Sequence, residues 1–255
     1  MPAGWRLVHW AWERARRKGV ITCDTPAGRR FASFGPGSML AFPPGTIFGQ
    51  GSIAIGTDVL VGEFVTLSAG LVPGQDLGPD PVLTVGDRCV IGRGSHVIAH
   101  QSVVIGADVF TGPYVYITDQ NHGYADPVMP IGRQLPVNVP VSIGAGSWLG
   151  AGSVVLPGAQ IGRNVVVAAG AVVRGTVPDH SVVAGVPARV VRSYVPGDGW
   201  VSSDHSASSD HHAVRLPGGS ARSACPPPPG PWRAARWSPP RPRSGRTCAP
   251  PDRRS

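Results

Sequence analysis

Residues 141–176 read VSIGAG SWLGAG SVVLPG AQIGRN VVVAAG AVVRGT, a pattern that repeats every six residues. A large apolar residue takes the third place of each hexapeptide, at Ile143, Leu149, Val155, Ile161, Val167 and Val173. Small residues, mostly Gly, Ala and Ser, surround these positions. The period matches neither the 3.6 residues of an α-helix turn nor the simple alternation of a strand. It indicates a short strand followed by a turn, repeated along the chain.

Three hexapeptides of this kind make one triangular coil of about 18 residues. The apolar residue points inward, and successive coils stack at the strand spacing of about 4.8 Å. The same period runs from Ile55 to Val97 and, after a slip of two residues beyond His100, from Ile105 to Ile117. The sequence therefore predicts an all-β fold, a parallel β-helix with about five coils over residues 55–174.

Two excursions interrupt the period. Residues 71–82 (LVPGQDLGPDPV) are rich in Pro and Gly, and residues 119–140 (DQNHGYADPVMPIGRQLPVNVP) form a longer interruption. Both are expected to be loops, and long loops on a rigid scaffold often carry function.

We divide the chain into a cap segment (1–45), a β-helix domain (46–195) and a Pro/Arg-rich tail (196–255). Trp5–Lys18 is predicted to form a helix that ends at Gly19. We expect this helix to cover the open end of the β-helix, whose edge must be blocked; the alternative is that its Trp and basic residues lie on a membrane surface. The tail has no apolar period and is expected to be disordered. Two interpretations of the tail stay open: it recruits a partner, or it is a non-native extension.

Net charge and composition limit the classes of function. The chain of 255 residues carries a formal charge of +8. Residues 1–200 hold 14 Lys+Arg and 12 Asp+Glu, whereas residues 201–255 hold 9 and 3. The body is thus nearly neutral, and a nucleic-acid-binding face is not indicated.

The apolar and cysteine patterns exclude further classes. No apolar stretch reaches the roughly 18 residues that a membrane span needs, and the N-terminus lacks the hydrophobic core of a signal peptide. We therefore expect a cytoplasmic protein. The four Cys are widely spaced with no CxxC pair, which argues against a zinc knuckle or a disulfide scaffold.

Four features occur in order: VVIGADVFTGPYVYITDQNHGY, a Pro-rich loop, PVSIGAGSWLGAGSVVLPG, and AGVPARVVR. Together they resemble the hexapeptide-repeat acyltransferases, most closely the branch of galactoside and maltose O-acetyltransferases. The resemblance covers about residues 50–195. It implies a left-handed β-helix, a homotrimer, and acetyl-CoA as co-substrate with no metal. It further implies that acyl-CoA and acceptor meet between neighbouring subunits.

His122 is the candidate catalytic residue. Acyl transfer from a thioester needs a base for the proton of the attacking group, and a neutral imidazole suits that step near pH 7. The resemblance implies that His122 is this base and that transfer is direct, without a covalent enzyme intermediate. Asp119, Asn121 and Tyr124 are candidates for orienting the imidazole or holding the acceptor. Turn formation is the alternative explanation for Asp119 and Asn121, and a purely structural role is favoured for Tyr124.

The coenzyme A positions follow from the same resemblance. Gly150 and Ala151 would lie beside the thioester, and Ala169 and Gly170 along the pantetheine arm. Small residues are, however, also what any β-helix corner needs. The remaining candidates are Arg174 and Arg189 near the phosphates, and Trp148 beside the groove. The alternatives are solvated surface charges for the two Arg and a purely structural role for Trp148. The galactoside enzymes have Thr-Lys where this chain has Arg174-Gly175, which leaves the phosphate contacts open.

Three other functions are alternatives. N-acylation of an amino sugar would use the same His on an amine, and a non-catalytic β-helix scaffold would bind a partner through its tail. A γ-type carbonic anhydrase would need three His on zinc. The candidates are His96, His100 and His122, but the period puts His96 and His122 at different places on the coil, so we expect no metal site.

Overall fold

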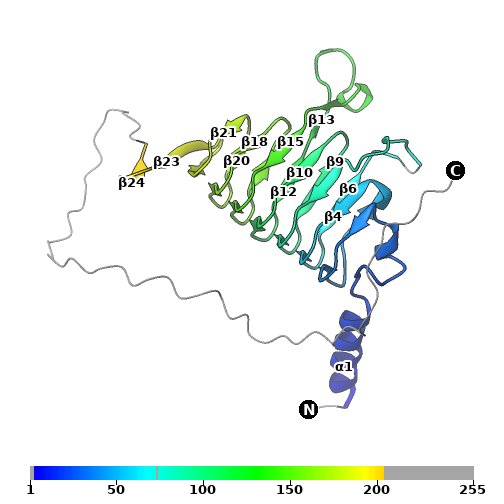
Figure 1. The fold of residues 1–255 in the computed structure, drawn as a ribbon. Helices are drawn as coiled ribbons and strands as arrows, with labels where there is room; N and C mark the ends of the chain where they lie inside the picture. The colour runs from blue at the N-terminus through cyan, green and yellow to red at the C-terminus, as the bar shows by residue number, and fades with distance from the viewer. Residues whose placement is uncertain (1–2, 73, 204–255) are drawn as a thin grey trace, which may run out of the picture. The chain divides into compact units, whose positions relative to one another are not determined.

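The computed structural model describes residues 3–72 and 74–203. The prediction of a disordered tail falls largely on residues 204–255, which lie outside the described residues. In the described part, short strands follow one another around a stack of coils (Figure 1). Nearly all neighbouring strands pair in parallel, as the six-residue period predicts. The expected all-β fold is confirmed.

Three sheets form the walls of the coils. The first sheet, in spatial order, is β1 (Ser33–Phe34), β4 (Ile53–Ile55), β7 (Leu83–Val85), β10 (Val103–Ile105), β15 (Val141–Ile143), β18 (Gln160–Ile161) and β21 (Thr176–Val177). The second is β2 (Met39–Leu40), β5 (Leu60–Val61), β8 (Val90–Ile91), β11 (Phe110–Thr111), β16 (Trp148–Leu149), β19 (Val166–Val167), β22 (Ser181–Ala184), β23 (Arg189–Val195) and β24 (Gly199–Ser202). The third is β3 (Ile47–Phe48), β6 (Thr66–Ala69), β9 (His96–Ala99), β12 (Tyr116–Thr118), β17 (Val154–Val155) and β20 (Val172–Val173).

The core is a set of apolar ladders inside the three walls. In the first sheet, residues in register stack inward and are all buried: Phe34, Ile55, Val85, Ile105, Ile143, Ile161 and Val177. The predicted inward positions of the decisive stretch, from Ile143 to Val173, are all buried. The large apolar residue of each hexapeptide in this stretch is therefore buried, and this burial helps to hold the coil closed.

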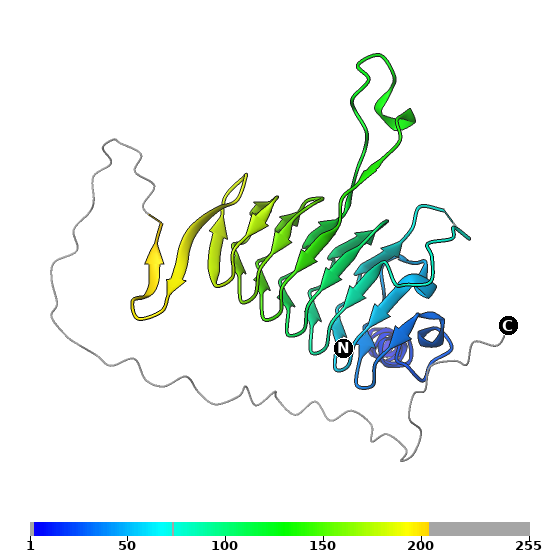
Figure 2. The same ribbon diagram turned by 45° about the horizontal axis from the view of Figure 1, so that its top comes forward.

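Two corners of the coil matter for function. At the corner from the second to the third sheet, which we call the glycine corner, nearly every coil has Gly or Ala, as at Gly112, Gly150 and Ala168. At the corner from the third to the first sheet, which we call the loop corner, residues 71–82 and 119–140 leave the stack. Figure 2 shows the 119–140 loop extending well away from the coils.

The coils begin earlier than the sequence period indicates. β1 pairs with β4 and β2 with β5, so a first coil starts at Ser33, inside the segment 1–45 assigned to the cap. Phe34 and Leu40 are six residues apart and both buried. The next step, to Ile47, takes seven residues and includes Pro43 and Pro44, so the six-residue period is not visible there. Before this coil, α1 (Ala3–Lys18) confirms the predicted helix.

The end of the fold departs from the parallel stack. β23 runs antiparallel to both β22 and β24, and no helix occurs among described residues 134–203. The last strand extends the fold to Ser202, past the predicted boundary at 195. Gly197 and Gly199, both with positive φ, make the turn, and Tyr194 contacts Trp200 across it.

Candidate active site

His122 lies on the 119–140 loop, just beyond a short antiparallel hairpin. The hairpin consists of β13 (Gln120–Asn121) and β14 (Val137–Asn138), with Asn121 opposite Val137. The Gln120 side chain donates a hydrogen bond of 3.0 Å to Asn138. His122 and the nearby Tyr124 are exposed to solvent. The two paired strands therefore form the base of the loop, and His122 follows directly after the first of them.

Side-chain contacts within the loop hold its tip. The Gln134 amide donates to the carbonyls of Asp126 and Met129, and its oxygen accepts from the Asp126 amide. The Asp126 carboxylate accepts from the amides of Val128 and Met129. Those two bonds hold the pKa of Asp126 below its usual value. A short 3-10 helix, Ile131–Arg133, completes the tip. The loop is therefore internally hydrogen-bonded over most of its length.

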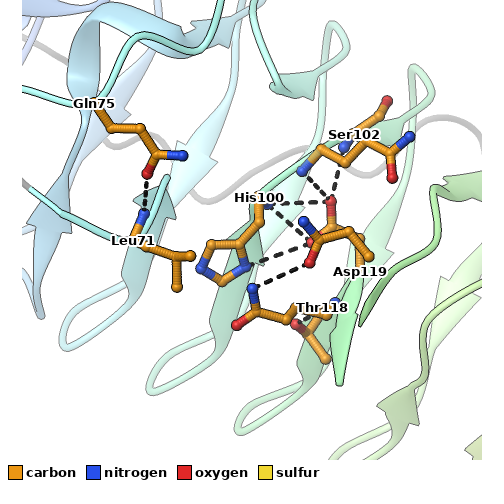
Figure 3. Close-up of polar contacts among 9 residues, drawn as sticks. Leu71, Gln75, His100, Ser102, Thr118 and Asp119 are labelled. Carbon is orange, nitrogen blue, oxygen red and sulfur yellow. Dashed lines mark hydrogen bonds and ion pairs between the residues drawn. The ribbon is translucent and has the colours of Figure 1, made fainter. Parts of the chain in front are cut away.

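Asp119 sits at the root of this loop and is fully buried. Its carboxylate accepts hydrogen bonds from the backbone amides of His100, Gln101 and Ser102, at 2.7 to 3.1 Å. Its own carbonyl accepts from the Val139 amide, which closes the loop. Figure 3 shows the carboxylate among these amides. The carboxylate that we expected to orient His122 or hold the acceptor thus binds the turn of the preceding coil; an additional role toward the acceptor stays a prediction.

His100 is a feature of this corner for which the sequence analysis had no role beyond the zinc alternative. Its ring is almost fully buried, and Nδ1 lies 3.7 Å from Oδ1 of Asp119, too far for a hydrogen bond (Figure 3). Burial lowers the pKa of His100 below its usual value, and the Asp119 charge opposes that shift only in part. His100 follows Ala99, which lies opposite Ala69 of β6. It therefore occupies the coil between those from which the two loops leave.

The predicted coenzyme A positions come together at the glycine corner. Gly150 donates to the Val167 carbonyl, and Gly170 donates to the Ala151 carbonyl, so these residues stack on consecutive coils. A Cβ added at Gly150 would lie 2.5 Å from the Ala169 amide nitrogen. Gly170 has a φ of +68°, and a Cβ added there would have no atom within 4 Å. The coil geometry by itself thus requires glycine at position 150, and coenzyme A binding there stays a prediction.

The remaining predicted residues divide between the corners. Arg189 is exposed at the start of β23, and the preceding Ala188 donates to the Val172 carbonyl, one coil beyond Gly170. Arg174 is exposed at the loop corner, away from the stacked small residues. Trp148 lies on the outer face of the second sheet, between Phe110 and Val166. Of the two arginines, Arg189 therefore lies nearer to the stacked small residues of the glycine corner.

The predicted site residues therefore form two groups on different corners of one chain. His122 and its neighbours belong to the loop corner, and the small residues belong to the glycine corner. The three His proposed for a zinc site do not cluster either. Within residues 3–72 and 74–203, no group of three or more His, Cys, Asp or Glu is arranged to hold a metal ion.

Comparison with known proteins identifies the repeats. The family model described as bacterial transferase hexapeptide (six repeats) matches residues 140–175, and that of the hexapeptide repeat of succinyl-transferase matches residues 82–118. The Escherichia coli (strain K12) protein named "Putative lipopolysaccharide biosynthesis O-acetyl transferase WbbJ" is 38% identical over 120 residues, which cover 44% of this chain and 61% of that one. The two matched stretches thus carry the hexapeptide repeats of bacterial transferases, and the chain is similar to a protein named as an O-acetyl transferase.

A second relative agrees with the expected branch. A galactoside O-acetyltransferase of Lactococcus lactis is 36% identical over 108 residues, covering 42% of this chain and 51% of that one. The chain spans about half to three-fifths of the length of these two curated relatives.

A solved structure supports the fold. It is a mutant of AntD, an N-acyltransferase from Bacillus cereus, in complex with dTDP-4-amino-4,6-dideoxyglucose and coenzyme A. The TM-score is 0.57 at 18% identity, over 68% of this chain and 89% of that one. At this identity the likeness concerns the fold, which is the left-handed parallel β-helix of hexapeptide-repeat acyltransferases.

Proposed function

We propose that the protein transfers an acyl group, acetyl in the first instance, from coenzyme A to a hydroxyl of a sugar or glycan precursor. The observation that carries this proposal is the stack of small residues at the glycine corner, in a chain whose relatives are named O-acetyltransferases. Four of these positions, Gly150, Ala151, Ala169 and Gly170, are the proposed path of the thioester arm along the coils. Arg189 and Arg174 are the candidate cations for its phosphates, and Trp148 is the candidate aromatic wall.

His122 is the proposed general base. Its imidazole takes the proton of the acceptor hydroxyl as the oxygen attacks the thioester carbonyl. Backbone amides of the coils would stabilise the negative charge that grows on the carbonyl oxygen. When the tetrahedral species collapses, the C–S bond breaks and the imidazolium returns its proton to the departing thiolate. Asn121 and Tyr124 flank the base and are the proposed acceptor contacts.

The division of the residues between two corners supports a site shared between subunits. The second sheet carries an outward ladder that is apolar throughout: Met39, Leu60, Val90, Phe110, Trp148, Val166 and Val182. The outward positions of the first sheet are mostly polar, with Thr84, Ser142 and Gln160 among them. An apolar ladder of this length favours contact with another protein surface. We propose that it packs in a homotrimer, which would bring a neighbour's loop to the glycine corner.

We also propose that the reaction takes place in the cytoplasm, where coenzyme A thioesters are made. Within the described residues, no helix combines the length and apolar character needed to cross a bilayer.

The direct test is release of free thiol from acetyl-CoA with a panel of sugar acceptors. His122→Ala should lower kcat by about 10²- to 10⁴-fold, because the base is lost. Val128→Ala is a matched control, since Val128 is an exposed residue of the same loop. Full acceptor-dependent turnover by His122→Ala would overturn the base assignment. If turnover occurs only with amino sugars, the proposed reaction is N-acylation rather than O-acylation. If coenzyme A does not bind, a non-catalytic scaffold is favoured.

A further inference from the structure

One face of α1 is apolar and exposed to solvent. At ~100° per residue, Leu7, Val8, Ala11, Trp12 and Ala15 fall on one side of the helix. The opposite side carries Arg6, His9, Glu13 and Arg17, together with Trp10, and Arg14 lies at the boundary beside Leu7. The exposed fractions of the large apolar side chains are 51% for Trp5, 64% for Leu7, 67% for Val8 and 58% for Trp10. The described fold thus leaves the first turns of an amphipathic helix uncovered.

Only the C-terminal half of α1 is attached to the coils. The Trp12 ring lies 6.3 Å from that of Phe42, and Arg16 forms an ion pair with Glu63. The Gly19 amide donates to the Ala15 carbonyl and ends the helix. In the first turns, by contrast, the ring contacts are internal to the helix, between Trp5 and His9 and between Trp10 and Arg14. The free half therefore projects with its apolar side chains available.

The helix has a much larger excess of basic over acidic residues than the rest of the described fold. The helix holds five cations, Arg6, Arg14, Arg16, Arg17 and Lys18, against one carboxylate, Glu13. Residues 19–200 hold 9 Lys+Arg and 11 Asp+Glu. Among the described residues, Arg16 is the one helix cation paired with a carboxylate. Positive charge is thus concentrated beside the exposed apolar face.

We infer that α1 docks the protein on an anionic lipid surface. Trp and Leu on one face with Arg and Lys on the other are typical of helices that lie in the plane of a membrane interface. Trp5, at the edge of the apolar face next to Trp12, would sit at the level of the headgroups, where an aromatic ring meets both water and acyl chain. The helix cations would be attracted to acidic headgroups. A second copy of the helix is the poorer partner, because it would bring five like charges together.

Sedimentation of the full chain with lipid vesicles tests this inference. One set of vesicles is pure phosphatidylcholine, and the other has roughly one third phosphatidylglycerol, an anionic content chosen to give a strong surface potential. The protein should sediment with the anionic set and stay in solution with the neutral set. Because the arginines of residues 204–255 also attract anionic lipid, the helix must be tested by variants that keep the charge. Leu7→Gln/Val8→Gln should lower partitioning at least about tenfold.

Matched charge variants complete the experiment. Arg6→Gln/Arg14→Gln should lower partitioning about fivefold for each removed cation. Arg163→Gln/Arg192→Gln removes the same charge from exposed positions outside the helix and should leave the helix contribution intact. The helix variants change exposed side chains, so the thermal unfolding midpoint should not move.

Three results would overturn the inference: no sedimentation of the unmodified protein with anionic vesicles, equal sedimentation of Leu7→Gln/Val8→Gln, or self-association through this face without lipid binding. The assay involves no turnover, so its outcome is independent of the proposed acyl transfer.

Discussion

Asp119 bonds two parts of the chain that the repeat separates. Its buried carboxylate accepts hydrogen bonds from three backbone amides of the turn at His100–Ser102. Asp119 is also the first residue of the loop that carries His122. Charge-assisted bonds of this kind are stronger than neutral ones. A single side chain thus shapes one turn and fixes the root of the candidate catalytic loop.

Asp119→Ala should lower the free energy of unfolding by about 3 kcal/mol or more, because three amides lose a charged acceptor. Urea unfolding followed by circular dichroism measures the change. Asp126→Ala is the control: it removes a carboxylate that also binds two amides but is fully exposed, so its effect should be clearly smaller. Equal losses for the two variants would contradict the role assigned to Asp119.

His100 should make stability depend on pH. Because burial lowers its pKa in the folded state, the unfolded chain binds more protons below the usual value of 6.5. Stability is therefore complete above that pH and falls as the pH drops from 6.5 toward the lower folded pKa. Thermal unfolding at pH 7.5 and 5.5 should show a larger decrease for the unmodified protein than for His100→Gln. Identical decreases would show that His100 does not titrate as its burial demands.

At the scale of the element, glycine sets the spacing of the coils. Gly150 has no room for a Cβ because the Ala169 amide nitrogen of the next coil would lie 2.5 Å away. Gly150→Ala should therefore cost about 1–3 kcal/mol of stability through overpacking. Gly51→Ala is the control, since nothing lies within 4 Å of the added Cβ and its φ is not positive. Chemical unfolding of both variants tests the prediction, which equal stabilities would contradict.

The strands at the two ends of the fold were not predicted from the sequence pattern. The coils over residues 55–174 were predictable because each hexapeptide buries one apolar residue at a set place. The first coil was missed because the seven-residue step that includes Pro43 and Pro44 breaks the period after a single step. The last strands were missed because β23 and β24 alternate in burial only weakly and pair antiparallel, outside the repeat.

At the scale of the folded unit, the outer faces differ in character. Phe110 on the second sheet and Val104 on the first belong to the same coil and are similarly exposed. Phe110→Glu should break up the proposed trimer, because it puts a charge in the middle of the apolar ladder, whereas Val104→Glu should leave it intact. Light scattering after size-exclusion chromatography measures the mass. A monomeric unmodified protein, or an equal response of both variants, would contradict this interface.

The sequence by itself determined the coil, its inward residues, its two loops and the resemblance to hexapeptide-repeat acyltransferases. This was possible because a six-residue period records local geometry: one buried apolar side chain and one tight corner per strand. The tertiary structure decided what the loops and corners bring together. The Asp119 carboxylate accepts hydrogen bonds from amides 17 to 19 residues earlier in the chain, and His100 is buried beside it. His122 lies at a different corner of the coil from Gly150. Such contacts depend on which coil stacks on which and on the length of each insertion, and these are properties of the stacked chain rather than of any hexapeptide.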